Sequence, residues 1–314
     1  FPMLRGHALY EGNYLLGTSI ARPLIAKRQI AIAKKFKAYA VSHGSTGKGN
    51  DQVRFELGYH YFDPKINIIS PWRKWKLSSR TDLIKYAIKN KISVPKDKKG
   101  ATPFSIDDNL YHTSTEGKIL ENPKNPAPEY IFQRTVSPEK APNKNKFINI
   151  GFKNGDPVTI NGIKLSPSSL LEKLNIIAGK NGIGRVDLVE NRFIGIKSRG
   201  VYETPGGTVL LIAHRAIESV TLDKKTMHKK YEMMPRYAQL IYNGYWYSKE
   251  RFKIQKIIDL KKNKINGSIK LKLYKGNVTI ISRQTKSNAY SMRKVSFEEN
   301  KTFNKLNVER FINF

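Results

Sequence analysis

The sequence predicts an α/β protein, with a doubly wound parallel sheet in its first part and an α+β arrangement in the rest. Three observations support this prediction. Up to about residue 92, short β-prone runs alternate with helical patterns, which is typical of a parallel sheet that binds its ligand at the carboxyl ends of its strands. Between residues 93 and 142 the periodicity fades. Beyond residue 142, hairpin and helix signals follow one another without strict alternation.

The first part is expected to open with a helix over residues 20–37. Its apolar side would hold Ile20, Leu24, Ile25, Ile32 and Phe36. Pro23 falls inside this range, and a proline lacks the amide hydrogen that a helix interior needs. The sequence therefore predicts a break or a helix start at Pro23.

Strands are expected over residues 38–41 and 66–69, which enclose a glycine-rich loop and a helix that starts at Asn50. A further helix is expected to run through residue 88. It would begin after Ser79, because Ser79 and Asp82 have the S-x-x-D spacing of a capping box. This order of strand, helix, strand and helix is the basis for the parallel sheet.

The second part is expected to begin with residues 93–142 as a long functional loop or linker, because they are rich in Pro, Lys and Asn. Asn154-Gly155 predicts a hairpin turn. Ser166-Pro167 is typical of a helix start, and Gly179 is expected to close that helix. Further strands are expected near residues 185–190, 192–197 and 208–213, and on both sides of the turn Lys275-Gly276-Asn277.

Composition excludes several kinds of site. The chain has no cysteine, so disulfides, thiolate zinc sites and cysteine nucleophiles are ruled out. Its six histidines form no H-x-x-x-H pair, so no structural transition-metal site is expected. The longest apolar run, Val209 to Ala213, is far short of a membrane span. With no visible signal peptide, a cytoplasmic protein that does not enter membranes is expected.

The charge is strongly basic, with 57 Lys and Arg against 25 Asp and Glu, a net charge of +32. Such a balance favours a polyanionic partner such as nucleic acid. The lysines are scattered, however, and no RNP-like aromatic motif accompanies them. We therefore interpret the charge as a general feature of the composition, and nucleic acid is not the expected partner.

The most informative stretch is Val41 to Glu56, V-S-H-G-S-T-G-K-G-N-D-Q-V-R-F-E. A strand, a loop with three glycines and a helix start together form a corner that suits an anion. It is not a Walker A loop, because glycine follows the lysine where Ser or Thr is required. Asp51 and Arg54 near this helix start have the charges to hold the two ends of an amino-acid zwitterion. The alternative is that Asp51 caps the helix and Arg54 is a solvated surface charge.

This segment resembles the second nucleotide and substrate motif of argininosuccinate synthases. Four more blocks resemble the same family and keep its order across nearly the whole chain: residues 10–23, 104–110, 184–192 and 197–205. The resemblance implies that residues 1–92 are the later part of an ATP pyrophosphatase-type nucleotide-binding domain, without its first strand and pyrophosphate loop. It also implies that residues 93–314 form an α+β synthetase and multimerisation domain.

The resemblance implies an enzyme of arginine biosynthesis. It would join citrulline to aspartate through a citrullyl-adenylate, with ATP and Mg²⁺ consumed as MgATP and with AMP and pyrophosphate released. Members of the family assemble as homotetramers in the cytoplasm. This reaction depends on positioning and charge stabilisation, so no residue is assigned as a nucleophile and no catalytic residue is named. No resident metal site is implied.

The resemblance also assigns ligands to residues. It gives citrulline to Tyr14, Ser19, Asn50, Arg54, Ser105, Ser114, Glu190 and Tyr202. It gives aspartate to Thr46, Asn50 and Asp51, and ATP to Gly44. Taken alone, several of these residues have simpler interpretations. Tyr14 suits a half-buried aromatic with a wet hydroxyl, Ser105 suits a turn or helix cap, and Glu190 and Tyr202 suit the polar ends of a strand pair. His43 is interpreted as a structural hydrogen-bonding residue.

The chain departs from the family pattern in three places. The S-G-G-x-D-T-S motif that wraps pyrophosphate is absent, the chain stops short of the family's C-terminal tail, and Lys118 stands where glycine is usual. The sequence therefore predicts a fragment that is inactive alone. Two alternatives stay open, a non-enzymatic remnant that still binds citrulline or aspartate, and a basic nucleic-acid-binding protein.

Overall fold

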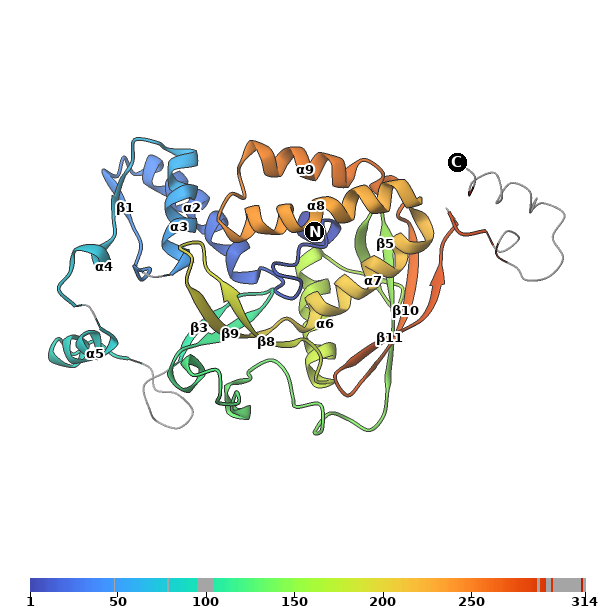
Figure 1. Ribbon diagram of the computed structural model, residues 1–314, viewed down its shortest axis with the longest axis horizontal. Helices are drawn as coiled ribbons and strands as arrows, with labels where there is room; N and C mark the ends of the chain where they lie inside the picture. Colours follow the sequence, from blue (N-terminus) through green and yellow to red (C-terminus); the bar gives the residue numbers. More distant parts are fainter. Residues whose placement is uncertain are drawn as a thin grey trace.

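A computed structural model describes residues 1–47, 49–77, 79–94, 104–286, 289–291, 295 and 312. Within them lie three sheets: a parallel pair, a five-stranded antiparallel sheet and a four-stranded antiparallel sheet. Figure 1 shows β1 (Ala40–Ser42), α2 (Gly17–Lys35) and α3 (Asn50–Phe62) at one end of the molecule. Toward the other end lie β10 (Gly267–Tyr274) and β11 (Asn277–Gln284), with β3 (Ser105–Asp108), β8 (Arg185–Asn191) and β9 (Lys197–Glu203) between the two ends. The mixture of parallel and antiparallel sheets confirms the predicted fold class, an α/β first part followed by an α+β second part.

The first part follows the predicted order. Its elements are α1 (Pro2–Arg5), α2 (Gly17–Lys35), β1 (Ala40–Ser42), α3 (Asn50–Phe62), β2 (Asn67–Ile69), α4 (Pro71–Lys74) and α5 (Arg80–Lys89). β1 and β2 pair in parallel, with Val41 opposite Ile68. The predicted capping box is confirmed, because the Ser79 hydroxyl accepts a hydrogen bond from the Asp82 amide at 3.1 Å. β1, the loop and α3 thus form the expected corner.

Two predictions about α2 are wrong. The helix passes through Pro23 without a break. Pro23 is the seventh residue of α2, so it removes one interior backbone hydrogen bond, and its buried position against the rest of the protein supports the helix there. The expected apolar side is also exposed, with Leu24, Ile25, Ile32 and Phe36 between 44% and 72% accessible. The buried side instead holds Pro23, Ala26, Ile30 and Ala33. These small residues allow a close approach to α3, where a side chain at Gly58 would meet Ala26 at 2.7 Å.

Among its described residues, the second part combines two antiparallel sheets with four long helices. Its strands are β3 (Ser105–Asp108), β4 (Thr113–Glu116), β5 (Lys146–Lys153), β6 (Asp156–Ile160), β7 (Ile163–Lys164), β8 (Arg185–Asn191), β9 (Lys197–Glu203), β10 (Gly267–Tyr274) and β11 (Asn277–Gln284). The α-helices are α6 (Pro167–Lys180), α7 (Pro205–Thr221), α8 (Lys224–Tyr242) and α9 (Lys249–Asp259). Short 3₁₀ turns are η1 (Lys118–Glu121), η2 (Glu129–Ile131) and η3 (Lys262–Lys264).

Two local predictions for this part are confirmed, the hairpin turn at Asn154-Gly155 and the helix cap at Ser166. Asn154 and Gly155 have φ values of 52° and 79°, which is the left-handed pair that a tight hairpin turn needs. Ser166 caps α6 as predicted, although the helix runs one residue past Gly179. Lys118, where glycine is usual in the family, also has a positive φ of 54°, a conformation that costs a non-glycine residue about 1 kcal/mol or more.

Three predictions for the second part are wrong. Residues 93–142 were expected to be a loop, yet they contain β3 and β4; polar side chains hide these strands from a hydropathy pattern. Residues 192–197 form mostly the turn between β8 and β9. Residues 208–213 lie inside α7, a helix buried on nearly every side, and a continuous apolar run does not distinguish such a helix from a strand.

The main core lies between the five-stranded sheet and helices α6 and α7. Leu170 and Leu174 of α6 are fully buried there, and each contributes about 1.5–3 kcal/mol by leaving water. A second cluster joins residues from the start of the chain to α8 and β9, among them Met3, Tyr14 and Tyr202. The start of the chain therefore packs against the second part. Within the described residues, no helix combines the length and apolar character that crossing a membrane requires.

Candidate active site

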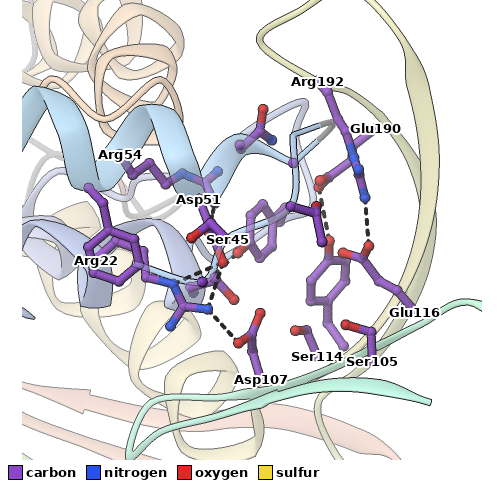
Figure 2. A pocket seen from close by; sticks show the side chains of 18 residues that line it. Arg22, Ser45, Asp51, Arg54, Ser105, Asp107, Ser114, Glu116, Glu190 and Arg192 are labelled. Atoms are coloured by element: carbon purple, nitrogen blue, oxygen red, sulfur yellow. Dashed lines mark hydrogen bonds and ion pairs between the residues drawn. The ribbon is translucent and has the colours of Figure 1, made fainter. Parts of the chain in front are cut away.

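A cavity of about 440 Å³ lies where the corner of β1 and α3 meets the four-stranded sheet. Figure 2 shows its charged side chains pointing toward one another from α2, α3 and the strands. Every residue that the resemblance assigned to a ligand lines it, apart from Ser19. The lining is Tyr14, Thr18, Arg22, Gly44, Ser45, Thr46, Gly49, Asn50, Asp51, Arg54, Phe55, Ser105, Asp107, Ser114, Glu116, Glu190, Arg192 and Tyr202.

The glycine corner presents the start of α3 to the cavity. Gly49 is the residue before the helix, and no side chain caps it, so the alternative that Asp51 caps the helix is wrong. The loop is held from within: the Gln52 side chain donates to the Gly47 carbonyl at 2.6 Å, and the Gly49 amide donates to the Thr46 carbonyl at 3.2 Å. An uncapped helix start beside a lined cavity is suited to an anion. Lys48 lies outside the described residues.

Arg54 is not a surface charge, because only 4% of it is exposed. Its Nη1 donates to Asp51 Oδ1 at 3.0 Å and its Nε donates to the Tyr242 carbonyl at 2.9 Å. The guanidinium also lies over the Tyr242 ring, 4.9 Å from the centroid. Burial alone would lower the pKa of Arg54, but Asp51 and other neighbours more than offset this, so the pKa is raised. Arg54 therefore stays charged inside the protein.

Asp51 lies between two guanidinium groups. Besides Arg54, it accepts hydrogen bonds from Arg22 Nε and Nη2 at 2.9 and 2.7 Å. Arg22 also pairs with Asp107 of β3. Sequence reasoning missed both Arg22 and Asp107, which link α2 and α3 to the four-stranded sheet across the cavity floor.

The opposite side of the cavity holds a buried carboxylate. Glu190 is 4% exposed and accepts hydrogen bonds from the Tyr202 hydroxyl at 3.0 Å and the Tyr242 hydroxyl at 2.8 Å. Burial raises the pKa of Glu190, and the hydrogen bond from Tyr242 opposes this. Glu190 and Tyr202 do lie on a strand pair, as the simpler interpretation proposed, but the pair turns them toward the cavity.

Tyr14 is buried rather than half-buried, with 3% exposed. Its ring lies 4.5 Å from that of Tyr202, and its hydroxyl accepts a hydrogen bond from the Thr18 amide at 3.3 Å. Burial is the main reason that the pKa of Tyr14 is raised to about 12. Ser19, the residue after Thr18 in α2, is fully buried. No described residue makes a hydrogen bond of normal geometry with its hydroxyl.

Strands β3 and β4 supply the remaining polar wall. Ser105 starts β3, so its interpretation as a turn or helix cap is wrong. Ser114 of β4 lies opposite Asp107 on one side and opposite Tyr202 on the other. Glu116, which sequence reasoning missed, accepts a hydrogen bond from Arg192 Nη2 at 2.6 Å. Burial raises the pKa of Glu116 to about 7 although Arg192 lowers it.

His43 lies outside the cavity lining. Its Nε2 is 2.9 Å from Glu56 Oε1, and its ring stacks on Phe55 at 5.7 Å. These contacts support the interpretation of His43 as a structural residue.

Comparison with known proteins identifies the family. Residues 1–93 match the description "Arginosuccinate synthase N-terminal HUP domain", and residues 104–314 match "Arginosuccinate synthase C-terminal domain". The chain is 84% identical to an argininosuccinate synthase of Pelagibacter ubique over 314 residues, covering 100% of this chain and 80% of that protein. It is 61% identical to an argininosuccinate synthase of Parvibaculum lavamentivorans over 299 residues, covering 95% of this chain and 73% of that protein.

The chain belongs to the argininosuccinate synthase family. The family predicted from the sequence motifs is thereby confirmed, as is the enzyme class, a carbon–nitrogen ligase of arginine biosynthesis that joins citrulline and aspartate. ATP as a substrate agrees with the HUP domain of the family.

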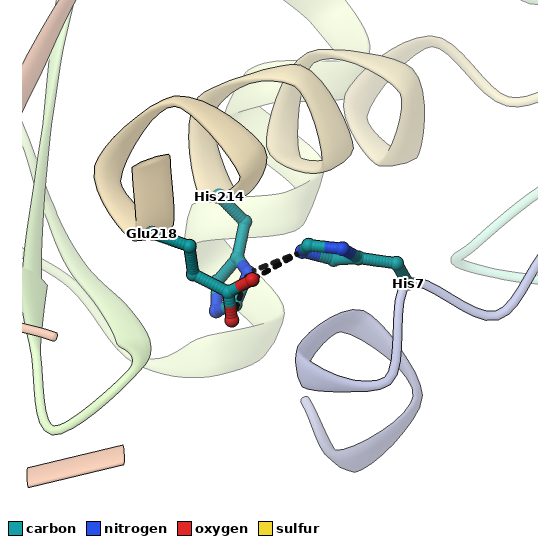
Figure 3. Close-up of side chains that lie close together, drawn as sticks. All are labelled: His7, His214 and Glu218. Carbon is teal, nitrogen blue, oxygen red and sulfur yellow. Dashed lines mark hydrogen bonds and ion pairs between the residues drawn. The ribbon is translucent and has the colours of Figure 1, made fainter. Parts of the chain in front are cut away.

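A second polar group lies outside the argininosuccinate synthase cavity. Figure 3 shows His7, from the start of the chain, meeting His214 and Glu218 of α7. The three offer ligand atoms within 4.8 Å of one another and are all buried. The histidine spacing considered in the sequence did not detect this group, because His7 is far away in the chain and the third member is a glutamate.

The hydrogen bonds within this group favour a neutral histidine pair over a metal site. His214 Nε2 lies 2.9 Å from the Gly155 carbonyl and therefore donates to it, which leaves Nδ1 to accept a hydrogen bond from His7 Nε2 at 2.8 Å. Burial lowers the pKa of both imidazoles well below the usual value. Glu218 is already paired with the buried ammonium of Lys230, so a metal ion would add charge beside an existing cation.

We expect Lys230→Met to lower the free energy of unfolding by about 3–5 kcal/mol, because it leaves the Glu218 carboxylate buried without its cation. Urea denaturation measures this. The double variant Lys230→Met with Glu218→Gln should recover much of the loss. Lys261→Met is the matched control, since its pair with Asp223 is largely exposed and is worth about 0–1 kcal/mol. A rise in Tm on adding zinc ions that disappears in His7→Ala would contradict the neutral-pair interpretation.

Proposed function

We propose that the cavity binds citrulline, aspartate and MgATP and that its residues hold them for adenylation and ligation. The observation that carries this proposal is the distribution of charge around one cavity. Arg54 and Arg22 lie on one side, while the buried carboxylate of Glu190 lies on the other. Two amino-acid zwitterions, each with an ammonium and a carboxylate, match such a lining. The glycine corner beside them suits the phosphates of a nucleotide.

For citrulline, we assign the carboxylate to Arg54 and the ammonium to the side of Glu190. Arg54 is charged and buried, so a carboxylate beside it gains a stronger interaction than it would in bulk water. Glu190 is held by two tyrosine hydroxyls, which fixes where its oxygens point. The remaining citrulline contacts are assigned to Tyr14, Ser19, Asn50, Ser105, Ser114 and Tyr202.

For aspartate, we assign the ammonium to Asp51, with Thr46 and Asn50 as neighbours. Asp51 is the second residue of α3, and it lines the same cavity as Gly44, which we assign to ATP. Binding would require the ammonium to take over part of the contact that Arg22 now makes with Asp51. Arg22 would keep its partner Asp107, so the exchange leaves no charge unpaired.

The proposed reaction needs no protein nucleophile. The ureido oxygen of citrulline attacks the α-phosphorus of ATP and pyrophosphate leaves; the aspartate amine then attacks the ureido carbon and AMP leaves. The protein contributes alignment and fixed charges aimed at the reacting groups. Mg²⁺ would enter with the nucleotide and offset the charge of its phosphates.

We further propose a homotetramer in the cytoplasm. Residues 1–92 would serve as the nucleotide-binding domain and residues 93–314 as the synthetase and multimerisation domain. Family membership supports these assignments.

The reaction is tested by supplying citrulline, aspartate and MgATP and measuring argininosuccinate and pyrophosphate. Two forms are compared, the 314-residue chain and the same chain preceded by a segment that carries S-G-G-x-D-T-S. We expect product only from the second form, because this motif supplies the pyrophosphate contacts in the family, while both forms bind citrulline. Citrulline binding without product from either form would favour the non-enzymatic remnant. Absence of citrulline binding from both would show that the proposal is wrong.

Arg54→Ala and Arg54→Lys should each weaken citrulline binding roughly 10- to 100-fold, since a charge-assisted hydrogen bond is lost and an ammonium does not reproduce the guanidinium fork. ATP affinity should change far less. Isothermal titration calorimetry measures both ligands. Arg251→Lys is the matched control, because Arg251 is also buried, donates to a backbone carbonyl and lies over aromatic rings, yet is outside the cavity. Equal citrulline affinities in Arg54→Lys and Arg251→Lys would remove Arg54 from the site.

Asp51→Asn should weaken aspartate binding to the citrulline-saturated protein roughly 10-fold or more, because the amide keeps the shape but loses the charge that holds the ammonium. The dissociation constant for citrulline should change by less than about 3-fold. Asp107→Asn is the matched control, since it removes the other carboxylate partner of Arg22 from the same cavity. If Asp51→Asn weakens citrulline and leaves aspartate unchanged, Asp51 serves citrulline and the assignment is wrong.

A further inference from the structure

Tyr242 connects the two sides of the cavity without belonging to its lining. It is the last residue of α8 and is fully buried. Its hydroxyl contacts Asn50 and Glu190, and its ring and backbone carbonyl both contact Arg54. In the sequence it is an ordinary aromatic residue near a helix end, and no motif distinguishes it.

The hydroxyl of Tyr242 is the middle of a directed chain of hydrogen bonds. The Phe193 amide donates to Asn50 Oδ1 at 2.9 Å, Asn50 Nδ2 donates to the Tyr242 hydroxyl at 2.8 Å, and this hydroxyl donates to Glu190 Oε1 at 2.8 Å. Each group uses its donor or acceptor once, so the orientation of the Asn50 amide is determined at both ends. The chain joins α3 to β8 and to the turn that follows β8.

The ring and carbonyl of Tyr242 hold Arg54. The carbonyl belongs to the last turn of α8, where carbonyls have no helical partner, and it accepts the hydrogen bond from Arg54 Nε. The ring contacts the Arg54 guanidinium and also stacks on the ring of Tyr10, whose centroid is 3.6 Å away. Gly244 allows the close approach, because it has a φ of 88° and a side chain there would meet the Arg54 backbone at 3.0 Å.

We propose that Tyr242 is a positioning residue that sets the distance and orientation of Asn50 and Arg54 relative to Glu190. It acts on the ligand only through these residues, and the identity of that ligand as citrulline rests on the proposed function above. The positioning itself is a property of the protein alone. It is therefore measurable whether or not citrulline is the ligand.

Tyr242→Phe tests the proposal, because it removes the hydroxyl and keeps the ring and the carbonyl. Tyr237→Phe is the matched control. Tyr237 lies on the same helix, is equally buried and hydrogen-bonds Gln255 through its hydroxyl, away from the cavity. Two quantities are measured in each variant: the hydrogen–deuterium exchange rate of the Phe193 amide, and the dissociation constant for citrulline by calorimetry.

In Tyr242→Phe we expect the Phe193 amide to exchange roughly 10-fold faster, because the Asn50 acceptor is no longer oriented. Citrulline should bind roughly 5- to 20-fold more weakly. Neither should change in Tyr237→Phe, whatever its loss of overall stability. Phe193 exchange that is unchanged in Tyr242→Phe, or that rises equally in both variants, would overturn the proposal.

The two arms separate this inference from the proposed function. If Phe193 exchange rises only in Tyr242→Phe but the parent protein binds no citrulline, the positioning role stands and the ligand assignment fails. If the parent protein binds citrulline and Tyr242→Phe binds it equally well, Tyr242 does not position the citrulline site and the inference fails.

Discussion

The buried guanidinium of Arg54 is the constraint on which the site depends. A charge that is 4% exposed must be paired and hydrogen-bonded, or folding would lose several kcal/mol. Asp51 and the Tyr242 carbonyl satisfy it. Asp51 in turn pairs with Arg22, and Arg22 pairs with Asp107. One buried cation thereby fixes the relative positions of α8, α3, α2 and β3, and the cavity lies along this line of alternating charge.

In the proposed reaction, which uses no protein nucleophile, the same line of charges would supply the alignment. The polar groups are held by one another before any ligand arrives, so little reorganisation is needed when charge develops in a reaction. When a ligand enters, each of its charged groups replaces a charged partner that the site residue already has. The net free energy gained per contact is therefore small, and binding depends strongly on geometry. Glu116 lies outside this line and pairs with Arg192, and burial raises its pKa to about 7.

The features of the fold that the sequence predicts correctly are those that depend on a few neighbouring residues. The capping box at Ser79 and the turn at Asn154-Gly155 use side-chain or backbone chemistry within a few residues, and both were predicted correctly. The face of α2 was predicted wrongly, since which side is buried depends on Gly58 of α3 and the close packing it allows. The apolar run at residues 208–213 was ambiguous in principle, because burial on all sides removes the periodicity.

Two of the cavity residues that sequence reasoning missed, Asp107 and Glu116, follow from one error in assigning strands. On a strand, residues two apart share a face, so Ser105 and Ser114 imply Asp107 and Glu116 as neighbours in the same cavity wall. If residues 93–142 are a loop, no such periodicity applies, and these two neighbours are not predicted. The same spacing relates Glu190 to Arg192 at the end of β8. Family motifs thus pointed to individual residues that line the cavity, whereas the paired charges between them required the sheet.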